Sequence, residues 1–187
     1  MASLPKYHLS PEEYLAIERK AEFKSEYIDG EIYAMPGASP RHNLIVGNII
    51  GELHARLKTT NCAVYPSDLK VRVPDSSKFF YPDVSVVCGE AQLADSEKDV
   101  VLNPVLIVEV LSDSTESFDR GAKFQAYQEI PTLNEYVLVA QDKYMVEHYV
   151  RQPDGWLYTK PKGTDATLTL AFLECHLKLD EVYRKVL

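Results

Sequence analysis

Two carboxylates within predicted strands are the main candidates in this sequence for catalysis or metal binding. Glu109 interrupts the otherwise apolar run 105–111, and Asp83 follows Pro82 at the start of another run of strand-forming residues. Burying a carboxylate is costly unless a cation or a metal ion accompanies it. Because neighbouring strands lie about 4.8 Å apart, the two side chains could meet if their strands are adjacent. Converging carboxylates repel each other, and Mg²⁺ or Mn²⁺, which bind oxygen ligands, would relieve that repulsion.

Lys123 is the third candidate, on a helix that residues 117–130 predict. Asp119, Lys123 and Tyr127 are spaced four residues apart and therefore share one face of that helix. A lysine on the helix that directly follows the Glu109 strand can lean back over the end of that strand. Structural alternatives stay open, namely a core ion pair for Glu109 and a turn at the start of a strand for Asp83. Lys123 could equally be an exposed lysine that pairs with Asp119.

Three further residues carry weaker signals. Glu31, after a predicted Asp-Gly turn, is either another active-site carboxylate or a charge on a hairpin. His42 begins a second helix, where it either faces the same cleft or hydrogen-bonds at the helix terminus. Asp119 could position Lys123. The sequence contains no G-x-S-x-G motif, P-loop or Gly-rich dinucleotide fingerprint.

The elements that must position these residues follow a mixed α/β pattern. A capping box at Ser10 predicts a first helix, Asp29-Gly30 predicts a hairpin, and an apolar residue every fourth position from Ile45 to Leu57 predicts a second helix over 40–58. Strands are predicted at 63–65, 69–73, 83–88, 105–111, 136–139, 145–151, 156–160 and 167–173, with a closing helix at 179–186. We expect residues 89–103 to be a surface excursion, and Gly121 to let the 117–130 helix approach the sheet closely. The prediction is one domain over residues 1–187, a mixed bent sheet flanked by helices.

Composition narrows the class of protein. The 187 residues suit one domain with a sizeable core. Residues 1–7 do not resemble a signal peptide, and no apolar run approaches the roughly 20 residues of a membrane helix, so a cytoplasmic protein is expected. The net charge of −8 counts against a strong general affinity for nucleic acid. The three cysteines are far apart and odd in number, which favours buried apolar residues over a disulfide framework or a metal knuckle.

An ordered set of motifs resembles the Uma family of restriction-endonuclease-like proteins, within the PD-(D/E)XK nuclease superfamily. The resemblance covers about residues 10–151. Its motifs are Asp29-Gly30-Glu31, Pro40-Arg41-His42, Pro82-Asp83, Glu109-Val110-Leu111-Ser112, Asp119 with Lys123 and Tyr127, and Glu135-Tyr136. It implies a restriction-endonuclease-like α+β core, here with an added N-terminal helix and hairpin and a C-terminal hairpin. It also implies a metal ion between Asp83 and Glu109.

This sequence departs from the superfamily pattern at the lysine expected two residues after the Glu, where Leu111 stands. Lys123 would then act as a migrated lysine that reaches the same site. Val137 replaces a Trp that is frequent in the family, a change that affects packing more than chemistry.

The resemblance therefore implies an endonuclease that uses Mg²⁺ or Mn²⁺ to hydrolyse phosphodiester bonds of DNA, with Asp83, Glu109 and Lys123 as catalytic residues. The main alternative is a non-catalytic nucleic-acid-binding or protein-interaction module on the same fold, which the acidic charge and Leu111 favour. A metal-dependent hydrolase of another substrate is a third hypothesis. A homodimer is conceivable, because the hairpin at 145–160 could pair with a second copy.

Overall fold

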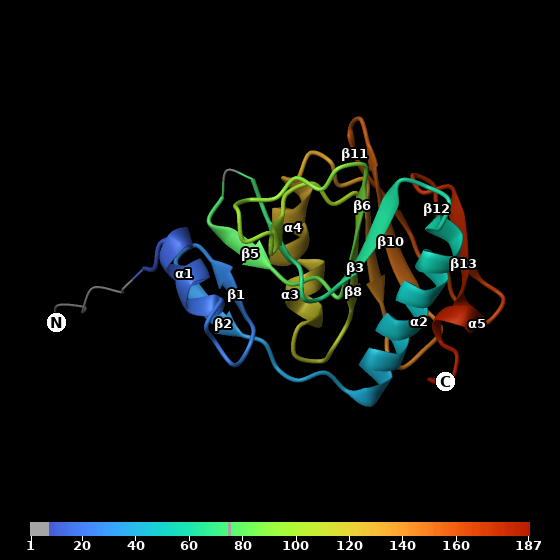
Figure 1. The fold of residues 1–187 in the computed structure, drawn as a ribbon. Coiled ribbons are helices and arrows are strands. Elements are labelled where there is room, and N and C mark those ends of the chain that lie inside the picture. Colours follow the sequence, from blue (N-terminus) through green and yellow to red (C-terminus); the bar gives the residue numbers. More distant parts are fainter. Residues whose placement is uncertain (1–7, 75) are drawn as a thin grey trace.

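A six-stranded mixed sheet forms the centre of the computed structural model, which describes residues 8–74 and 76–187 (Figure 1). The strand order is β11-β10-β9-β8-β6-β3, with β8 parallel to β9 and antiparallel to β6. The strands are β3 (Cys62–Pro66), β6 (Val84–Cys88), β8 (Leu106–Val110), β9 (Glu135–Val139), β10 (Val146–Gln152) and β11 (Gly155–Thr159). Residues 1–7, in which no signal peptide is expected, lie outside the described residues.

β8 runs through the middle of this sheet, and all five of its residues are buried, as its apolar sequence predicts. Its even-numbered residues join the core that includes the inner face of α2 (Pro40–Leu57), whereas Ile107 joins the core beneath α4 (Ala122–Gln128). Because side chains alternate along a strand, Glu109 lies on the same face as Ile107 and points to the α4 side.

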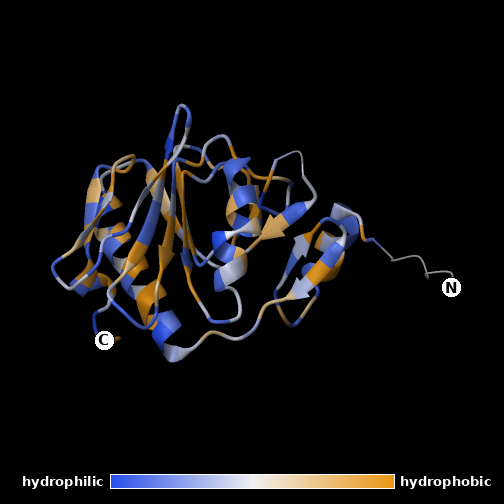
Figure 2. Ribbon diagram, turned by 180° about the vertical axis from the view of Figure 1, so that it is seen from behind, coloured by the Kyte–Doolittle hydropathy of each residue, from blue (hydrophilic) through white to orange (hydrophobic). Residues whose placement is uncertain are grey.

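The helix α2 forms for the reasons that its sequence indicates. The Ser39 side chain accepts a hydrogen bond from the His42 N–H, and a proline occupies the first turn. The stripe Ile45, Ile49, Leu53 and Leu57 is buried. Figure 2 shows apolar residues gathered on the central strands and alternating with polar residues along the helices beside them. No helix in the described part of the chain is long and apolar enough to span a membrane.

A second, five-stranded sheet carries the N-terminal part of the chain. Its order is β2-β1-β5-β4-β7, formed by β2 (Glu31–Ala34), β1 (Ser25–Ile28), β5 (Lys78–Phe80), β4 (Lys70–Arg72) and β7 (Val100–Val101). The hairpin predicted at Asp29-Gly30 is confirmed, with positive φ at both turn residues. The predicted capping box of α1 (Pro11–Glu18) is also present. Since β1 pairs with β5, the hairpin lies against the segment that leads into Asp83.

Several short elements were not expected. β5 and β7 were absent from the prediction, and the polar stretch 89–103 is not only a surface excursion, because Val100 and Val101 of β7 are fully buried. The predicted strand at 167–173 is the shorter β12 (Thr167–Leu170), which pairs with β13 (Cys175–Lys178) before the helix α5 (Leu179–Val182). β12, β13 and α5 cover the same core as α2.

The single helix predicted over 117–130 is interrupted. It divides at Gly121 into α3 (Glu116–Arg120) and α4, because Gly121 has a non-helical backbone with φ −109° and ψ −105°. A Cβ at this position would lie 3.0 Å from the Ser117 carbonyl oxygen. The glycine therefore marks a break between two helices rather than a close approach of one helix to the sheet.

The prediction for the cysteines was wrong in part. Cys62 and Cys88 are direct partners across β3 and β6 and form a disulfide, whereas Cys175 is buried and free. Cross-strand pairing brings together two residues that lie 26 positions apart in the chain, and this spacing does not by itself indicate a disulfide. Disulfides that persist are more typical of oxidising compartments than of a reducing cytoplasm.

Removing this disulfide should destabilise the protein. Replacing both Cys62 and Cys88 by alanine is expected to lower the free energy of unfolding by about 2–4 kcal/mol, because the unfolded chain loses a cross-link. Urea unfolding of the double variant beside the Cys175→Ala variant measures the difference. A thiol titration of the wild type in denaturant should count one free thiol, and a count of three would contradict the disulfide.

Candidate active site

Asp83 and Glu109 meet at one end of the six-stranded sheet. The antiparallel register pairs Ser85 with Ile107 and Val84 with Val108. Continued by one residue, this register sets Asp83 opposite Glu109, where paired side chains have Cβ atoms about 5 Å apart. The Asp83 carboxylate also accepts a hydrogen bond of 2.7 Å from the Val110 N–H, which holds it against the end of β8.

Lys123 brings a positive charge into this region. Its Nζ lies 2.9 Å from Glu109 Oε1, 2.9 Å from Glu26 Oε1 and 3.7 Å from Asp119 Oδ1. Only 6% of its side chain is exposed, so it is not the exposed lysine that was the structural alternative. The lysine leans from α4 over the strand that carries Glu109, as the sequence predicted.

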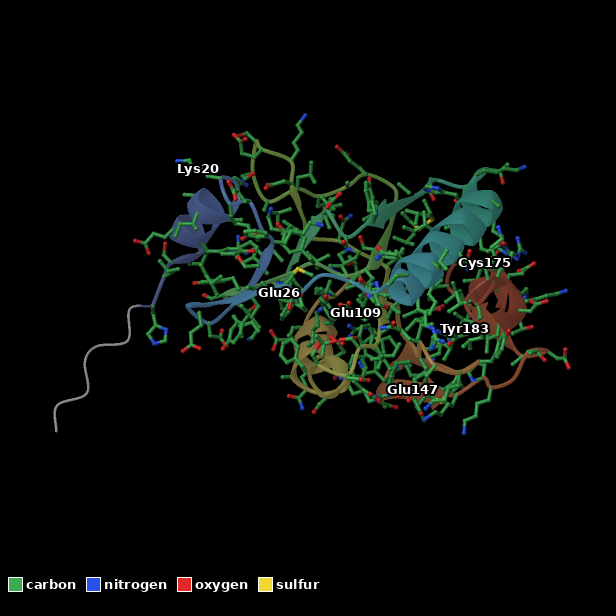
Figure 3. All side chains as sticks on the ribbon, turned by 90° about the horizontal axis from the view of Figure 1, so that it is seen from below. Lys20, Glu26, Glu109, Glu147, Cys175 and Tyr183 are labelled. Atoms are coloured by element: carbon green, nitrogen blue, oxygen red, sulfur yellow. A yellow bond between two sulfur atoms is a disulfide. The ribbon has the colours of Figure 1, made fainter. Side chains whose placement is uncertain are left out.

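Glu26 is a member of this cluster that the sequence analysis did not single out. It lies on β1, and its Oε1 accepts a hydrogen bond from the Tyr81 N–H as well as contacting Lys123. Figure 3 labels Glu26 on the N-terminal hairpin near Glu109 on the central sheet, and both carboxylates contact Lys123. The available signal was a carboxylate within the strand-forming run before the Asp-Gly turn, but nothing in the sequence indicated that β1 would reach α4.

The carboxylates strongly influence one another. Burial raises the pKa of Glu109 well above its ordinary value, and the charges of Asp119, Asp83 and Glu26 raise it further, against the opposing effect of Lys123. Burial alone would lower the pKa of Lys123, but Glu109, Glu26 and Asp119 together raise it above its ordinary value. The lysine is therefore held as an ammonium ion. Three carboxylates surround this ammonium and Asp83 adds a fourth beside Glu109, so the cluster would carry an excess of three negative charges with all four ionised.

Two side chains of the α3–α4 region orient the cluster further. The Tyr127 hydroxyl donates a hydrogen bond of 3.0 Å to Glu109 Oε1, the same oxygen that Lys123 contacts. Asp119 is buried, burial raises the pKa of its carboxyl group, and its backbone carbonyl accepts a hydrogen bond from the Tyr136 hydroxyl. The predicted common face of Asp119, Lys123 and Tyr127 therefore survives the break at Gly121.

His42 reaches the site from the first turn of α2. Its Nε2 lies 3.1 Å from Asp83 Oδ2, and its side chain is 14% exposed. Its Nδ1 is buried and has no hydrogen-bond partner among the described residues. Ser39 and Gln141 tie the start of α2 to the chain after β8, because Ser39 donates to the Gln141 side chain and Gln141 donates to the Leu111 carbonyl. His42 thus faces the same site as Asp83.

Glu31 lies on the same hairpin as Glu26 but is not among the described residues that contact Lys123. Its register partner on β1 is Ile28, so it shares a face of the hairpin with Glu26, two residue pairs further along. Its carboxylate accepts a hydrogen bond of 2.8 Å from the Tyr33 hydroxyl. The carboxylate of the hairpin that contacts Lys123 is Glu26.

Comparison with known proteins places this chain in a family. Residues 11–180 match the family described as "Uma2: Putative restriction endonuclease". The chain belongs to the Uma2 family. Two proteins of Synechocystis sp., named "Uncharacterized protein sll1609" and "Uncharacterized protein slr1290", are 39% and 37% identical to it. The matches cover 89% and 97% of this chain and 94% and 95% of those proteins.

A solved structure supports the fold. It is the crystal structure of "a putative nuclease belonging to DUF820 from Anabaena variabilis ATCC 29413" and superposes with a TM-score of 0.78 at 18% identity. The match covers 96% of this chain and 99% of the other. The predicted restriction-endonuclease-like fold, a mixed sheet flanked by helices, is confirmed, and at this identity the likeness concerns the fold alone.

The Uma2 chain has no lysine on the strand of its central glutamate. Leu111, at the position where the superfamily has that lysine, packs in the core beneath α4. Lys123 instead brings its ammonium within 2.9 Å of the Glu109 carboxylate. Val137 is fully buried in the core on the α2 side, which agrees with a role in packing.

The chemistry of the cluster suits a hard divalent cation. Its carboxylates supply the oxygen ligands that Mg²⁺ and Mn²⁺ bind, and they outnumber the one ammonium group, Lys123, that contacts them. Across residues 8–74 and 76–187, no three His, Cys, Asp or Glu side chains already form a metal-binding group. Mg²⁺ does not require such a group, because it is usually held by one or two carboxylates together with waters and substrate phosphates.

Proposed function

We propose that this Uma2 protein is a divalent-metal-dependent endonuclease that hydrolyses phosphodiester bonds of DNA. The observation that carries the proposal is the juxtaposition of Asp83, Glu109 and Lys123 at one end of the central sheet, where carboxylate groups outnumber the ammonium group. The description of the family and the likeness in fold to a putative nuclease support phosphodiester hydrolysis as the reaction. The Cys62–Cys88 disulfide is more typical of an oxidising compartment, but we retain the cytoplasm, where a DNA substrate would be met, as the proposed location.

Asp83 and Glu109 would hold the metal ion, either Mg²⁺ or Mn²⁺. When bound, such an ion lowers the pKa of a water molecule and stabilises the charge that develops on the phosphate. Lys123 would orient the attacking water or neutralise the developing oxyanion, which a fixed ammonium does well in a site shielded from bulk water. Glu26 and Asp119 would keep that ammonium protonated and in place.

Two more residues would position the metal-binding carboxylates. Tyr127 donates a hydrogen bond to Glu109, and His42 contacts Asp83. Residues that hold a ligand in this way commonly matter nearly as much as the ligand itself.

A non-catalytic module is the second candidate, because a net charge of −8 is unusual for a protein that must bind the phosphate backbone of a nucleic acid. In that case the same cluster would be a buried ion-pair network without turnover. Such a module could still bind nucleic acid or another protein through other surfaces.

A cleavage assay separates the two candidates. Supercoiled plasmid, linear duplex DNA, single-stranded DNA and RNA are incubated with the purified protein and Mg²⁺, Mn²⁺ or EDTA. The proposal expects nicking of DNA with either metal ion and none with EDTA. The Lys143→Ala variant is the matched control, since Lys143 is 57% exposed and pairs with the neighbouring Asp142. Binding of Mn²⁺ without cleavage of any of these substrates would favour the module.

His42 offers a test of the support given to Asp83. Replacing it by alanine is expected to weaken Mn²⁺ binding about 10–100-fold, as loss of a ligand's partner typically does. His42→Gln should recover part of the affinity because the amide can still donate to Asp83. Calorimetric titration with Mn²⁺ gives the affinities, and His54→Ala, an exposed histidine of the same helix, is the control. Wild-type affinity in His42→Ala would remove this residue from the site.

A further inference from the structure

The strand β11 forms an open edge of the central sheet. It is the last strand in the order β11-β10-β9-β8-β6-β3, and no other strand of the described chain pairs with its outer side. The β10–β11 hairpin rises above the neighbouring elements at the top of the view in Figure 1. An open edge presents unpaired backbone N–H and C=O groups and can pair with another strand.

The hairpin geometry identifies the free backbone groups. Gln152 and Gly155 flank a two-residue turn, so they exchange both backbone hydrogen bonds, and the paired groups then alternate along the strands. Gly155, Leu157 and Thr159 therefore direct their N–H and C=O groups to β10. Trp156 and Tyr158 direct theirs outward, away from the sheet.

The side chains do not protect this edge. β11 contains no charged residue, no proline and no lysine, which are the usual means of blocking an exposed edge. Leu157 is 54% exposed and Tyr158 is 46% exposed, on opposite faces of the strand. Charges occur only just outside it, at Asp154 on the turn and at Lys160 after the last strand residue.

We propose that a second copy of this chain covers the edge by antiparallel pairing of β11 with itself about a two-fold axis at Leu157. In this register Trp156 faces Tyr158 of the second copy, so their outward N–H and C=O groups can exchange hydrogen bonds, and two aromatic pairs form across the interface. Leu157 of each copy meets its own equivalent. Such self-complementary contacts are the form of a two-fold dimer interface.

Charge complementarity supports this register. Asp154 of one copy comes opposite Lys160 of the other, at both ends of the paired strands. Lys160 already contacts Glu147 of its own chain at 2.9 Å, and it keeps 33% of its side chain exposed for a second carboxylate. A parallel pairing would instead bring Asp154 near Asp154 and Lys160 near Lys160.

A cysteine scan tests the register. Leu157→Cys should form an intermolecular disulfide on mild oxidation, since residues on the axis have Cα atoms about 4.5 Å apart. Thr159→Cys is the matched control on the same strand and face, and its two copies would be about 14 Å apart along the strand direction. Non-reducing gel electrophoresis should show a covalent dimer for the first variant and none for the second. Equal cross-linking of both variants, or none in Leu157→Cys, would overturn the register.

Light scattering after size exclusion tests the dimer itself. The wild type at about 50 µM should have twice the chain mass of 21.2 kDa. Leu157→Lys should be monomeric, because two ammonium groups would face each other at the axis, while Phe23→Lys, at an exposed apolar residue of the N-terminal region, should remain dimeric. A monomeric wild type, or a dimer that survives Leu157→Lys, would refute the proposal. Neither outcome depends on nuclease activity, so the test is independent of the proposed function.

Discussion

Replacing Lys123 by methionine is expected to reduce DNA cleavage at least about 100-fold while leaving metal binding intact. The Lys123 ammonium would stabilise charge on the phosphate at this site, and loss of one such group costs that much in other enzymes. Methionine keeps the approximate length and the apolar stem of the side chain but loses the Nζ that lies 5.6 Å from the centroid of the Phe80 ring. With the ammonium gone, the carboxylates of Glu26, Glu109 and Asp119 should still attract Mn²⁺.

The same change should lower stability when no metal is present. Removing one partner of a buried ion pair costs about 3–5 kcal/mol, because the remaining charges stay buried without compensation. Added Mn²⁺ should therefore raise the melting temperature of Lys123→Met more than that of the wild type. Urea unfolding and melting curves with and without Mn²⁺ measure both effects, beside the Lys143→Ala control. Wild-type cleavage by a folded Lys123→Met protein would show that this lysine has no part in the reaction.

Replacing Asp83 by asparagine should weaken metal binding but leave the stability of the metal-free protein intact, the reverse of what is expected for Lys123→Met. The amide oxygen can still accept the hydrogen bond from the Val110 N–H, so the end of β8 should keep its structure. Loss of one negative charge relieves repulsion at Glu109, and the metal-free protein should be no less stable than the wild type. Mn²⁺ affinity should fall at least about 100-fold, because replacing even a residue that supports a metal ligand typically lowers metal affinity by about 10–100-fold. Cleavage should be lost together with the metal ion.

Calorimetric titration and melting curves distinguish this result from simple unfolding. The increase in melting temperature that Mn²⁺ gives the wild type should be absent in Asp83→Asn. Asp142→Asn is the matched control, because the Asp142 side chain is 70% exposed. Unchanged Mn²⁺ affinity in Asp83→Asn would exclude this carboxylate as a metal ligand and leave the cluster as an ion-pair network.

The local sequence determined much of the fold and part of the site. The apolar run around Glu109 predicted a strand buried on both faces, and the fourfold spacing from Ile45 to Leu57 predicted the buried stripe of α2. Spacing alone also put Asp119, Lys123 and Tyr127 on one helical face. These features depend on the periodicity of side chains along a helix or a strand, and the spacing of apolar and polar residues in the sequence shows that periodicity directly.

Only the tertiary structure decided which distant residues meet. Glu26 reaches Lys123 because β1 pairs with β5, and Cys62 bonds to Cys88 because β3 and β6 are in register. Strand pairing depends on hydrogen bonds between segments far apart in the chain, and no local pattern encodes the partner. The break at Gly121 also appears only in the structure, where this residue has a non-helical backbone, because a glycine within a helical pattern is compatible with an intact helix or an interrupted one. The sequence alone thus determined the side chains that could act together, and sheet topology decided that Glu26 joins them beside Asp83, Glu109 and Lys123.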